Sequence, residues 1–188
     1  RRRHTRYISV TGVQTCALPI SKGAPYAPGG TVPLRGAPVR LEASGNAAAA
    51  RFVTDAEGLK IVSGGEGEAF SRRVERLLKA EALKALTERT RVHAERLGKP
   101  MPKVGVNDPK ARWGSCTPSR AAIRYSWRLI LAPDWILDYV AAHEVAHLIH
   151  ADHSPRFWAV VAELFGDHRP ARAWLRAHGH GLHAVGRA

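Results

Sequence analysis

Short apolar and polar runs alternate in the first part of the chain. After them the apolar residues recur with the period of a helix. From Thr31 to Ser63, four β-like runs separated by turn residues predict a small antiparallel β meander. From about Glu68 to Leu97, apolar residues recur every three or four positions, which predicts one long helix with a charged, solvated face. Gly98 and Pro100 are expected to end this helix.

A second β-rich section follows the long helix. The runs PKVGV, ARWGSC and AAIRYSWRLI predict strands, with residues 117–120 as a hairpin turn. In the last run, apolar residues alternate with polar ones, which is typical of a strand with one buried face; the apolar positions are Ile123, Tyr125, Trp127 and Leu129. Pro133 is expected to open a helix that carries WILDYVAAHEVAHLI. These patterns together predict an α+β fold, in which a small antiparallel sheet, the helix that carries HEVAH and further packing helices follow a β meander and a long helix.

The segment HEVAHLIHADH, His143 to His153, contains four histidines and two acidic residues. On a helix, His143 and His147 project from one face and can reach one ion. Glu144 is rotated by about 100°, which puts it beside that ion. Two nitrogen ligands and a carboxylate that can take a proton from water are what a hydrolytic zinc site requires. The alternative, two surface histidines, is disfavoured because the apolar neighbours predict burial.

A catalytic zinc ion usually takes three protein ligands, and the candidates for the third are His150 and His153. If the helix continued, His150 would lie roughly 10 Å along its axis from His143, too far to share one ion. The Ser-Pro pair that follows His153 predicts a new helix and therefore a preceding turn. We predict His153 as the third ligand and His150 as a loop residue. Asp152 is expected to adopt an unusual backbone conformation, and it is a lesser candidate for a ligand or for a residue that orients one.

Several linked motifs resemble, in this order, the YgjP-like metallopeptidases, a bacterial zincin family related to the SprT-like and WLM proteases. These motifs are RWGSC, IRYSWRLILAP, DYVAAHEVAHL, DHSPRFW and AWLRAHG. The resemblance is close over about residues 112–179 and looser before them. It implies a zincin-like fold and a WGSC strand beside the active-site cleft. It also implies one zinc ion held by His143, His147 and His153, with Glu144 as catalytic acid/base.

The function predicted is that of a zinc metallopeptidase of the endopeptidase type, in which a zinc-activated water attacks the peptide bond and Glu144 is general acid/base. An exposed sheet edge would hold the polypeptide substrate as an added strand. A metzincin is disfavoured, because His150 stands where its turn glycine would be and the only methionine, Met101, lies upstream. Two alternatives stay open: a nucleic-acid-associated SprT-like protease, and a non-catalytic, zinc-stabilised binding module. Glu144 argues against the second, since a structural zinc site is normally closed by a fourth ligand.

Other side chains near these motifs have less certain roles. The candidates for stabilising an oxyanion, each expected to be structural first, are Tyr125, Tyr139, Arg124 and His168. Trp113 and Cys116 are expected to be a buried aromatic residue and a small buried thiol. The run HGHGLH, residues 178–183, could bind metal weakly but is expected to be a frayed tail.

Composition sets the class of protein and its domain organisation. The chain has 188 residues, of which 45% are hydrophobic, as expected for a folded globular domain. It has no apolar run approaching the roughly 18 to 20 residues that cross a bilayer, so we expect no membrane association, and its cysteine content favours a cytoplasmic location. The expected divisions are a non-native segment (1–20), a flexible lead-in (21–30), one metallopeptidase domain (31–180, motif core 103–179) and a tail (181–188).

The non-native segment is predicted from its sequence. VTGVQTCALPI, Val10 to Ile20, can be back-translated into a sequence resembling a sequencing-library adapter. Without residues 1–20, Cys116 is the only cysteine, which excludes an internal disulfide and favours a reducing compartment. The segment holds four arginines and no acid, so its removal lowers the net charge from +13 to +9. That charge permits a nucleic-acid partner, but its spread along the chain favours scattered solvated residues. Resequencing the genomic locus tests the hypothesis.

Overall fold

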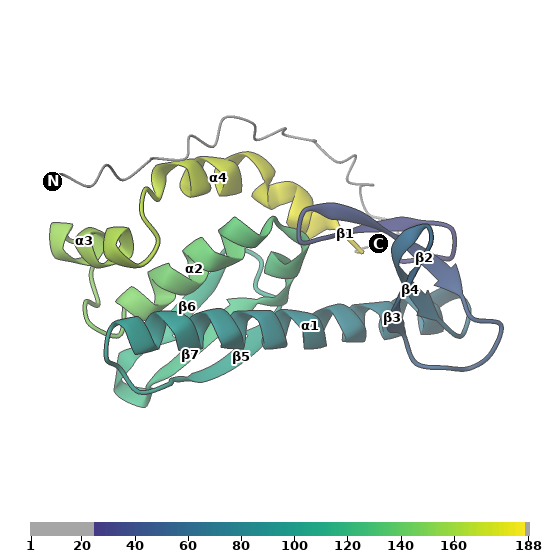
Figure 1. Ribbon diagram of the computed structural model, residues 1–188, viewed down its shortest axis with the longest axis horizontal. Coiled ribbons are helices and arrows are strands. Elements are labelled where there is room, and N and C mark those ends of the chain that lie inside the picture. The colour runs from purple at the N-terminus through teal and green to yellow at the C-terminus, as the bar shows by residue number, and fades with distance from the viewer. Residues whose placement is uncertain (1–24, 187–188) are drawn as a thin grey trace, which may run out of the picture.

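The computed structural model describes residues 25–186 (Figure 1). The predictions for residues 1–20 lie outside the described residues. Two small sheets and four α-helices confirm the predicted α+β class. The elements are β1 (Thr31–Leu34), β2 (Ala37–Ala43), β3 (Arg51–Asp55), β4 (Gly58–Ser63), α1 (Gly67–Arg96), β5 (Lys103–Asn107), β6 (Gly114–Thr117), β7 (Ala122–Ser126), α2 (Asp134–Ala146), α3 (Pro155–Leu164) and α4 (Arg169–Ala184), with 3₁₀ turns η1 (Pro118–Arg120) and η2 (Trp127–Leu131).

The first sheet is not the antiparallel meander that the sequence predicts. Its strand order is β1-β2-β4-β3, and β2 pairs with β4 in parallel. Leu41 and Ile61 are neighbours in that pairing, and both are buried. The strands with core-facing residues therefore lie side by side, whereas β3, which is mostly exposed, occupies the edge.

Helix α1 runs from the first sheet to the second and packs beside α2 (Figure 1). Its buried face includes Phe70, Val74 and Leu78, at the helical spacing that the sequence predicts. Gly98, with φ of 62°, ends the helix as expected. The amides of Gly98 and Lys99 bond to the carbonyls of Glu95 and Ala94, at 2.9 Å each, which is the Schellman arrangement.

The second sheet lies at the other end of α1 and is mixed, with order β5-β7-β6. The β6–β7 hairpin is antiparallel and turns at η1, as predicted, but β5 and β7 are parallel, so the expected antiparallel sheet is wrong in this pairing. The strand also stops at Ser126, and η2 follows in place of the predicted continuation through Trp127 and Leu129. All five η2 residues are buried, including Arg128. The alternation of apolar and polar residues through Trp127, Arg128 and Leu129 therefore does not mark a strand with one exposed face.

The turn that carries the last histidine of the motif connects α2 to α3. Helix α2 ends at Ala146, and α3 begins at Pro155 as predicted. Asp152 does not have the unusual backbone that we expected, since the described non-glycine residues with positive φ are Arg35 and Ala121. No helix within residues 25–186 is long and apolar enough to cross a membrane.

Residues 178–183, and the described part of the lead-in, residues 25–30, both make specific packing contacts. Residues 178–183 belong to α4 and are not a frayed tail. Gly179 of α4 is buried against the Trp113 ring. A Cβ atom at this position would lie 2.9 Å from that ring, so the lack of a side chain lets the helix pack closely. In the lead-in, Tyr26 is buried and its backbone amide donates to the Ser71 hydroxyl at 3.2 Å.

A buried arginine links the second sheet to the end of α4. Arg128 is only 2% exposed, and its guanidinium makes a bidentate pair with Asp108 at 2.7 and 3.2 Å. It also donates to the carbonyls of Leu182 and Val185, at 3.2 and 2.5 Å. These bonds satisfy the last carbonyl groups of α4, which have no helical partner.

Replacing this arginine should therefore destabilise the whole domain. We expect Arg128→Ala to lower the free energy of unfolding by about 2 kcal/mol, because the carbonyls of Leu182 and Val185 lose their buried charged donor. Arg124→Ala, at an exposed residue of β7, is the control and should cost less than about 0.5 kcal/mol. Urea unfolding of both variants tests this, and equal losses would contradict it.

Candidate metal centre

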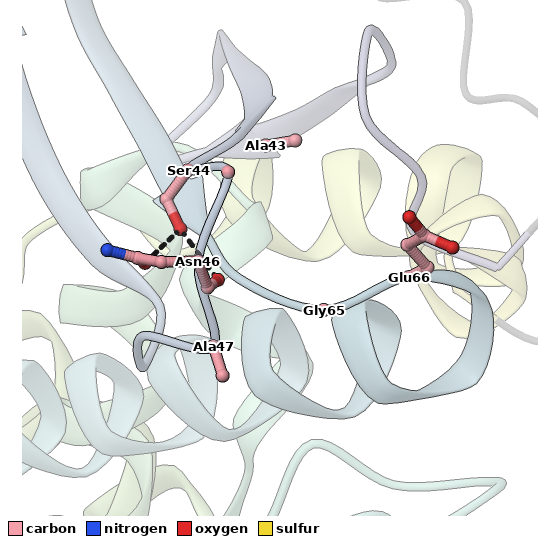
Figure 2. Close-up of a pocket in the computed structure, with 7 residues that line it drawn as sticks. Ala43, Ser44, Asn46, Ala47, Gly65 and Glu66 are labelled. Carbon is pink, nitrogen blue, oxygen red and sulfur yellow. Dashed lines mark hydrogen bonds between the residues drawn. The ribbon is translucent and has the colours of Figure 1, made fainter.

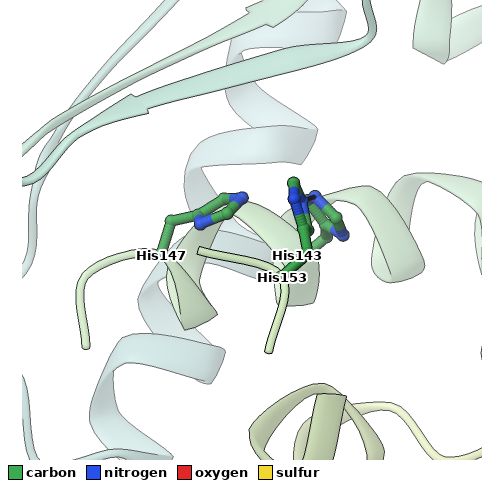
Figure 3. A group of neighbouring side chains, drawn as sticks. All are labelled: His143, His147 and His153. Carbon is green, nitrogen blue, oxygen red and sulfur yellow. Dashed lines mark hydrogen bonds between the residues drawn. The ribbon is translucent and has the colours of Figure 1, made fainter. Parts of the chain in front are cut away.

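Three histidines meet where α2 ends. His143 lies in the last turn of α2, His147 follows that turn, and His153 precedes α3. Their candidate ligand atoms all lie within 4.8 Å of one another, and the Nε2 atoms of His143 and His153 are 3.2 Å apart. Figure 3 shows the three rings next to one another. Among the described residues, this is the one cluster of three or more histidine, cysteine or acidic side chains that could hold a metal ion.

The fourth histidine of the segment contributes its backbone. Nδ1 of His147 lies 2.9 Å from the carbonyl oxygen of His150. Because a carbonyl only accepts, Nδ1 carries the hydrogen, and Nε2 of His147 keeps its lone pair. His150 lies outside the cluster, in the loop where we predicted it. The bond orients the His147 ring in the way that a ligand ring is usually oriented.

The environment favours the neutral forms of His143 and His147. Burial, with the nearby His147 and His153, lowers the pKa of His143 to about 3, and burial also lowers the pKa of His147. Nδ1 of His143 is buried and has no hydrogen-bond partner among the described residues. Three imidazoles packed this closely, with no acidic side chain among them, fit a divalent metal ion that prefers nitrogen ligands.

One aromatic side chain from α3 packs against all three rings. The Phe157 ring is fully buried, and its centroid lies 4.9, 4.5 and 4.8 Å from those of His143, His147 and His153. In the sequence, Phe157 is one of several apolar residues at helical spacing, which predicts only that it belongs to a packing helix. The contact makes one wall of the centre apolar and restricts rotation of the imidazoles.

Glu144 lies beside the histidines on the side of β6. It is 5% exposed, and burial raises its pKa to about 7, while the Arg112 guanidinium acts in the opposite direction. A cavity of about 350 Å³ opens between the helix and the strand. Its lining residues are Gly114, Ser115, Cys116, Pro118, His143, Glu144, His147, Ala151 and His153.

The structure places the other candidate residues away from this cavity. Tyr125 is buried, with its hydroxyl 2.9 Å from Thr90, and Arg124 is exposed on the same strand. Tyr139 packs behind the His143 ring at 5.9 Å, and His168 stacks on Trp158 at 4.2 Å. None of these four lines the cavity.

Trp113 and Cys116 differ from each other. Trp113 is partly buried and stacks on His183 with the ring centroids 4.4 Å apart, which is the packing role that we expected. Cys116 is also partly buried against the core, but unlike Trp113 it lines the cavity. Burial raises the pKa of this thiol to about 11, and the nearby Glu144 adds to the shift, so the thiol is protonated at neutral pH.

A second cavity, of about 500 Å³, lies between the loop after β2 and the start of α1 (Figure 2). Its lining is Ala43, Ser44, Gly45, Asn46, Ala47, Gly65 and Glu66. Glu66 is the one ionisable side chain among them. The Ser44 hydroxyl is bonded to Asn46, at 2.9 Å from Oδ1 and 3.2 Å from the backbone oxygen. This cavity therefore lacks the convergent polar groups of the histidine centre.

Comparison with known proteins gives one family. The sequence model described as "YgjP-like, metallopeptidase domain" matches residues 8–178. A search of curated proteins gave no match. Among solved structures, the crystal structure of the metallopeptidase zymogen of Pyrococcus abyssi abylysin matches at 22% identity with a TM-score of 0.44. The match covers 50% of this chain and 92% of that one.

The raised pKa of Glu144 predicts how stability depends on pH in metal-free protein. As pH rises, the unfolded chain loses this proton near 4.5 and the folded chain only near 7, so stability falls between these values. At about 1.4 kcal/mol per pKa unit, the full loss is about 3 kcal/mol. Glu144→Gln does not ionise, so its stability relative to the parent should increase by about 2 to 3 kcal/mol from pH 5 to pH 8. Urea unfolding at both values measures this, and a constant difference would contradict it.

Proposed function

The chain belongs to the YgjP-like metallopeptidase family, and we propose that it is a zinc-dependent endopeptidase. In this proposal His143, His147 and His153 are the zinc ligands, and Glu144 is the general acid/base. The observation that carries it is the cluster of three imidazoles beside a buried carboxyl, all lining one cavity. Three protein ligands, with a cavity where a fourth would lie, are typical of a catalytic zinc site.

When bound, zinc would lower the pKa of a water molecule and polarise the carbonyl group of the peptide bond. The choice of zinc is supported by the ligand type, because imidazole nitrogens suit it well. The chain's part is to present the three nitrogens together. His150 fixes one ring through its carbonyl group, and Phe157 packs against all three.

Glu144 would move the proton in both halves of the reaction. It takes a proton from the attacking water while the water oxygen bonds to the carbonyl carbon of the substrate. The carbon–nitrogen bond then breaks, and Glu144 gives the proton to the leaving amine, so one water is added across the peptide bond. A carboxyl with a pKa of about 7 is suited to both steps near neutral pH.

The edge of the second sheet would hold the polypeptide substrate. Strand β6 is at the end of this sheet and pairs with β7 along one side. Its residues Gly114, Ser115 and Cys116 line the cavity. An extended peptide could therefore add to β6 as a further strand, with backbone hydrogen bonds that place a peptide bond over the centre.

The ligand assignment is tested by zinc content in a matched pair of variants. His153→Ala should reduce zinc far below one ion per chain, because it removes one of three ligands. His150→Ala is the control, since the contact of His150 with the centre is through its carbonyl group, and it should keep one zinc. Elemental analysis after zinc loading and dialysis measures both. Equal zinc in the two variants would contradict the assignment.

The catalytic role is tested with Glu144→Gln. This variant should keep one zinc and lose at least about 10²-fold in the rate of cleavage of an unfolded polypeptide, which is the usual size of a general acid/base contribution. Unchanged cleavage would contradict the role of Glu144. Zinc in the parent without cleavage of any of several unfolded polypeptides would favour a zinc-stabilised binding module.

A further inference from the structure

We propose that Gly114 is a positioning residue, and that the absence of its side chain creates the slot that holds the Glu144 carboxyl over β6. This inference rests on the proposed function, because it concerns the group that moves the proton. A glycine inside a strand often marks a close approach of another group to the backbone. Here the approaching group is a side chain of α2.

The space beside Gly114 is filled by Glu144. A Cβ atom built on Gly114 would lie 2.4 Å from Oε1 of Glu144, 2.6 Å from Cδ and 2.6 Å from Cγ. Cβ atoms essentially never approach other heavy atoms this closely, so any larger residue requires something to move. Gly114 does not have positive φ, so its backbone does not itself require glycine. The three nearest atoms that such a Cβ would meet all belong to the Glu144 side chain.

The strand has little freedom to move away from α2. Gly114 pairs with Tyr125, which is fully buried in β7. The preceding residue, Trp113, accepts a hydrogen bond at 2.8 Å from the amide of Ser126. Its ring also packs against Gly179 and stacks on His183 of α4. Contacts on two sides therefore hold the start of β6 in place.

The movable group in this contact is the end of the Glu144 side chain. The backbone of α2 is fixed by fully buried residues on both sides of Glu144, Ala142 and Val145. An alanine at position 114 would push the carboxyl away from its place between the strand and the histidines. A misplacement of about 1 Å at a reacting group can cost about 10²-fold in rate. The three atoms nearest to a Cβ on Gly114 all belong to Glu144 and none to a histidine, so zinc binding should be preserved.

Gly114→Ala and Gly105→Ala form a matched pair for testing this inference. Both glycines lie in strands of the second sheet without positive φ, but a Cβ on Gly105 meets nothing within 4 Å. We expect Gly114→Ala to keep one zinc and a KM within about threefold of the parent, and to lose about 10²-fold in kcat. Gly105→Ala should match the parent in zinc content, KM and kcat. A normal kcat in Gly114→Ala would overturn the inference.

A double-mutant cycle separates positioning from a general structural effect. If Gly114 acts through Glu144, then Gly114→Ala should cause no further loss of kcat in the Glu144→Gln background. A further loss as large as in the parent would overturn the inference.

Crystal structures of the zinc-loaded parent and Gly114→Ala decide the question even if the parent cleaves no substrate, an outcome that would count against the proposed function alone. The inference requires a displaced Glu144 carboxyl and unmoved histidines. An unmoved carboxyl would overturn it.

Discussion

The geometry of the three-histidine centre depends on helix α2 ending at Ala146. If this helix continued, His153 would lie about 15 Å along the axis from His143, because each residue adds 1.5 Å. The turn instead returns His153 to within 3.2 Å of His143, measured between Nε2 atoms. The same turn places the His150 carbonyl where it bonds to the His147 ring. One interruption of a helix thus gathers three nitrogens and orients one of them.

The position of the Glu144 carboxyl group depends on a second constraint, the close packing of α2 on β6. Glu144 is buried because the strand approaches at a residue without a side chain. The strand is held there by Trp113, which packs on Gly179 of α4, and the end of α4 is in turn bonded to Arg128. Elements far apart in the sequence therefore fix the position and the raised pKa of one acid.

The sequence predicts correctly those features that depend on the spacing of nearby residues. It does not predict features that depend on packing between elements far apart in the chain. The clustering of His143 with His147 follows from helical geometry, and the return of His153 follows from the Ser-Pro start of α3. The parallel pairing of Leu41 with Ile61 could not be predicted, because no local pattern records strand order. For the same reason Gly179 looks like a helix breaker until Trp113 is seen against it, and Gly114 looks like an ordinary turn or strand glycine.

The most direct test of the central claim is a crystal structure of the zinc-loaded protein, with anomalous scattering measured at the zinc edge. The account predicts one strong anomalous peak per chain, about 2.0 to 2.1 Å from one ring nitrogen each of His143, His147 and His153. Glu144 should lie beside the ion without binding it. A peak at other residues, or a zinc ion coordinated by Glu144 in place of one histidine, would contradict the account.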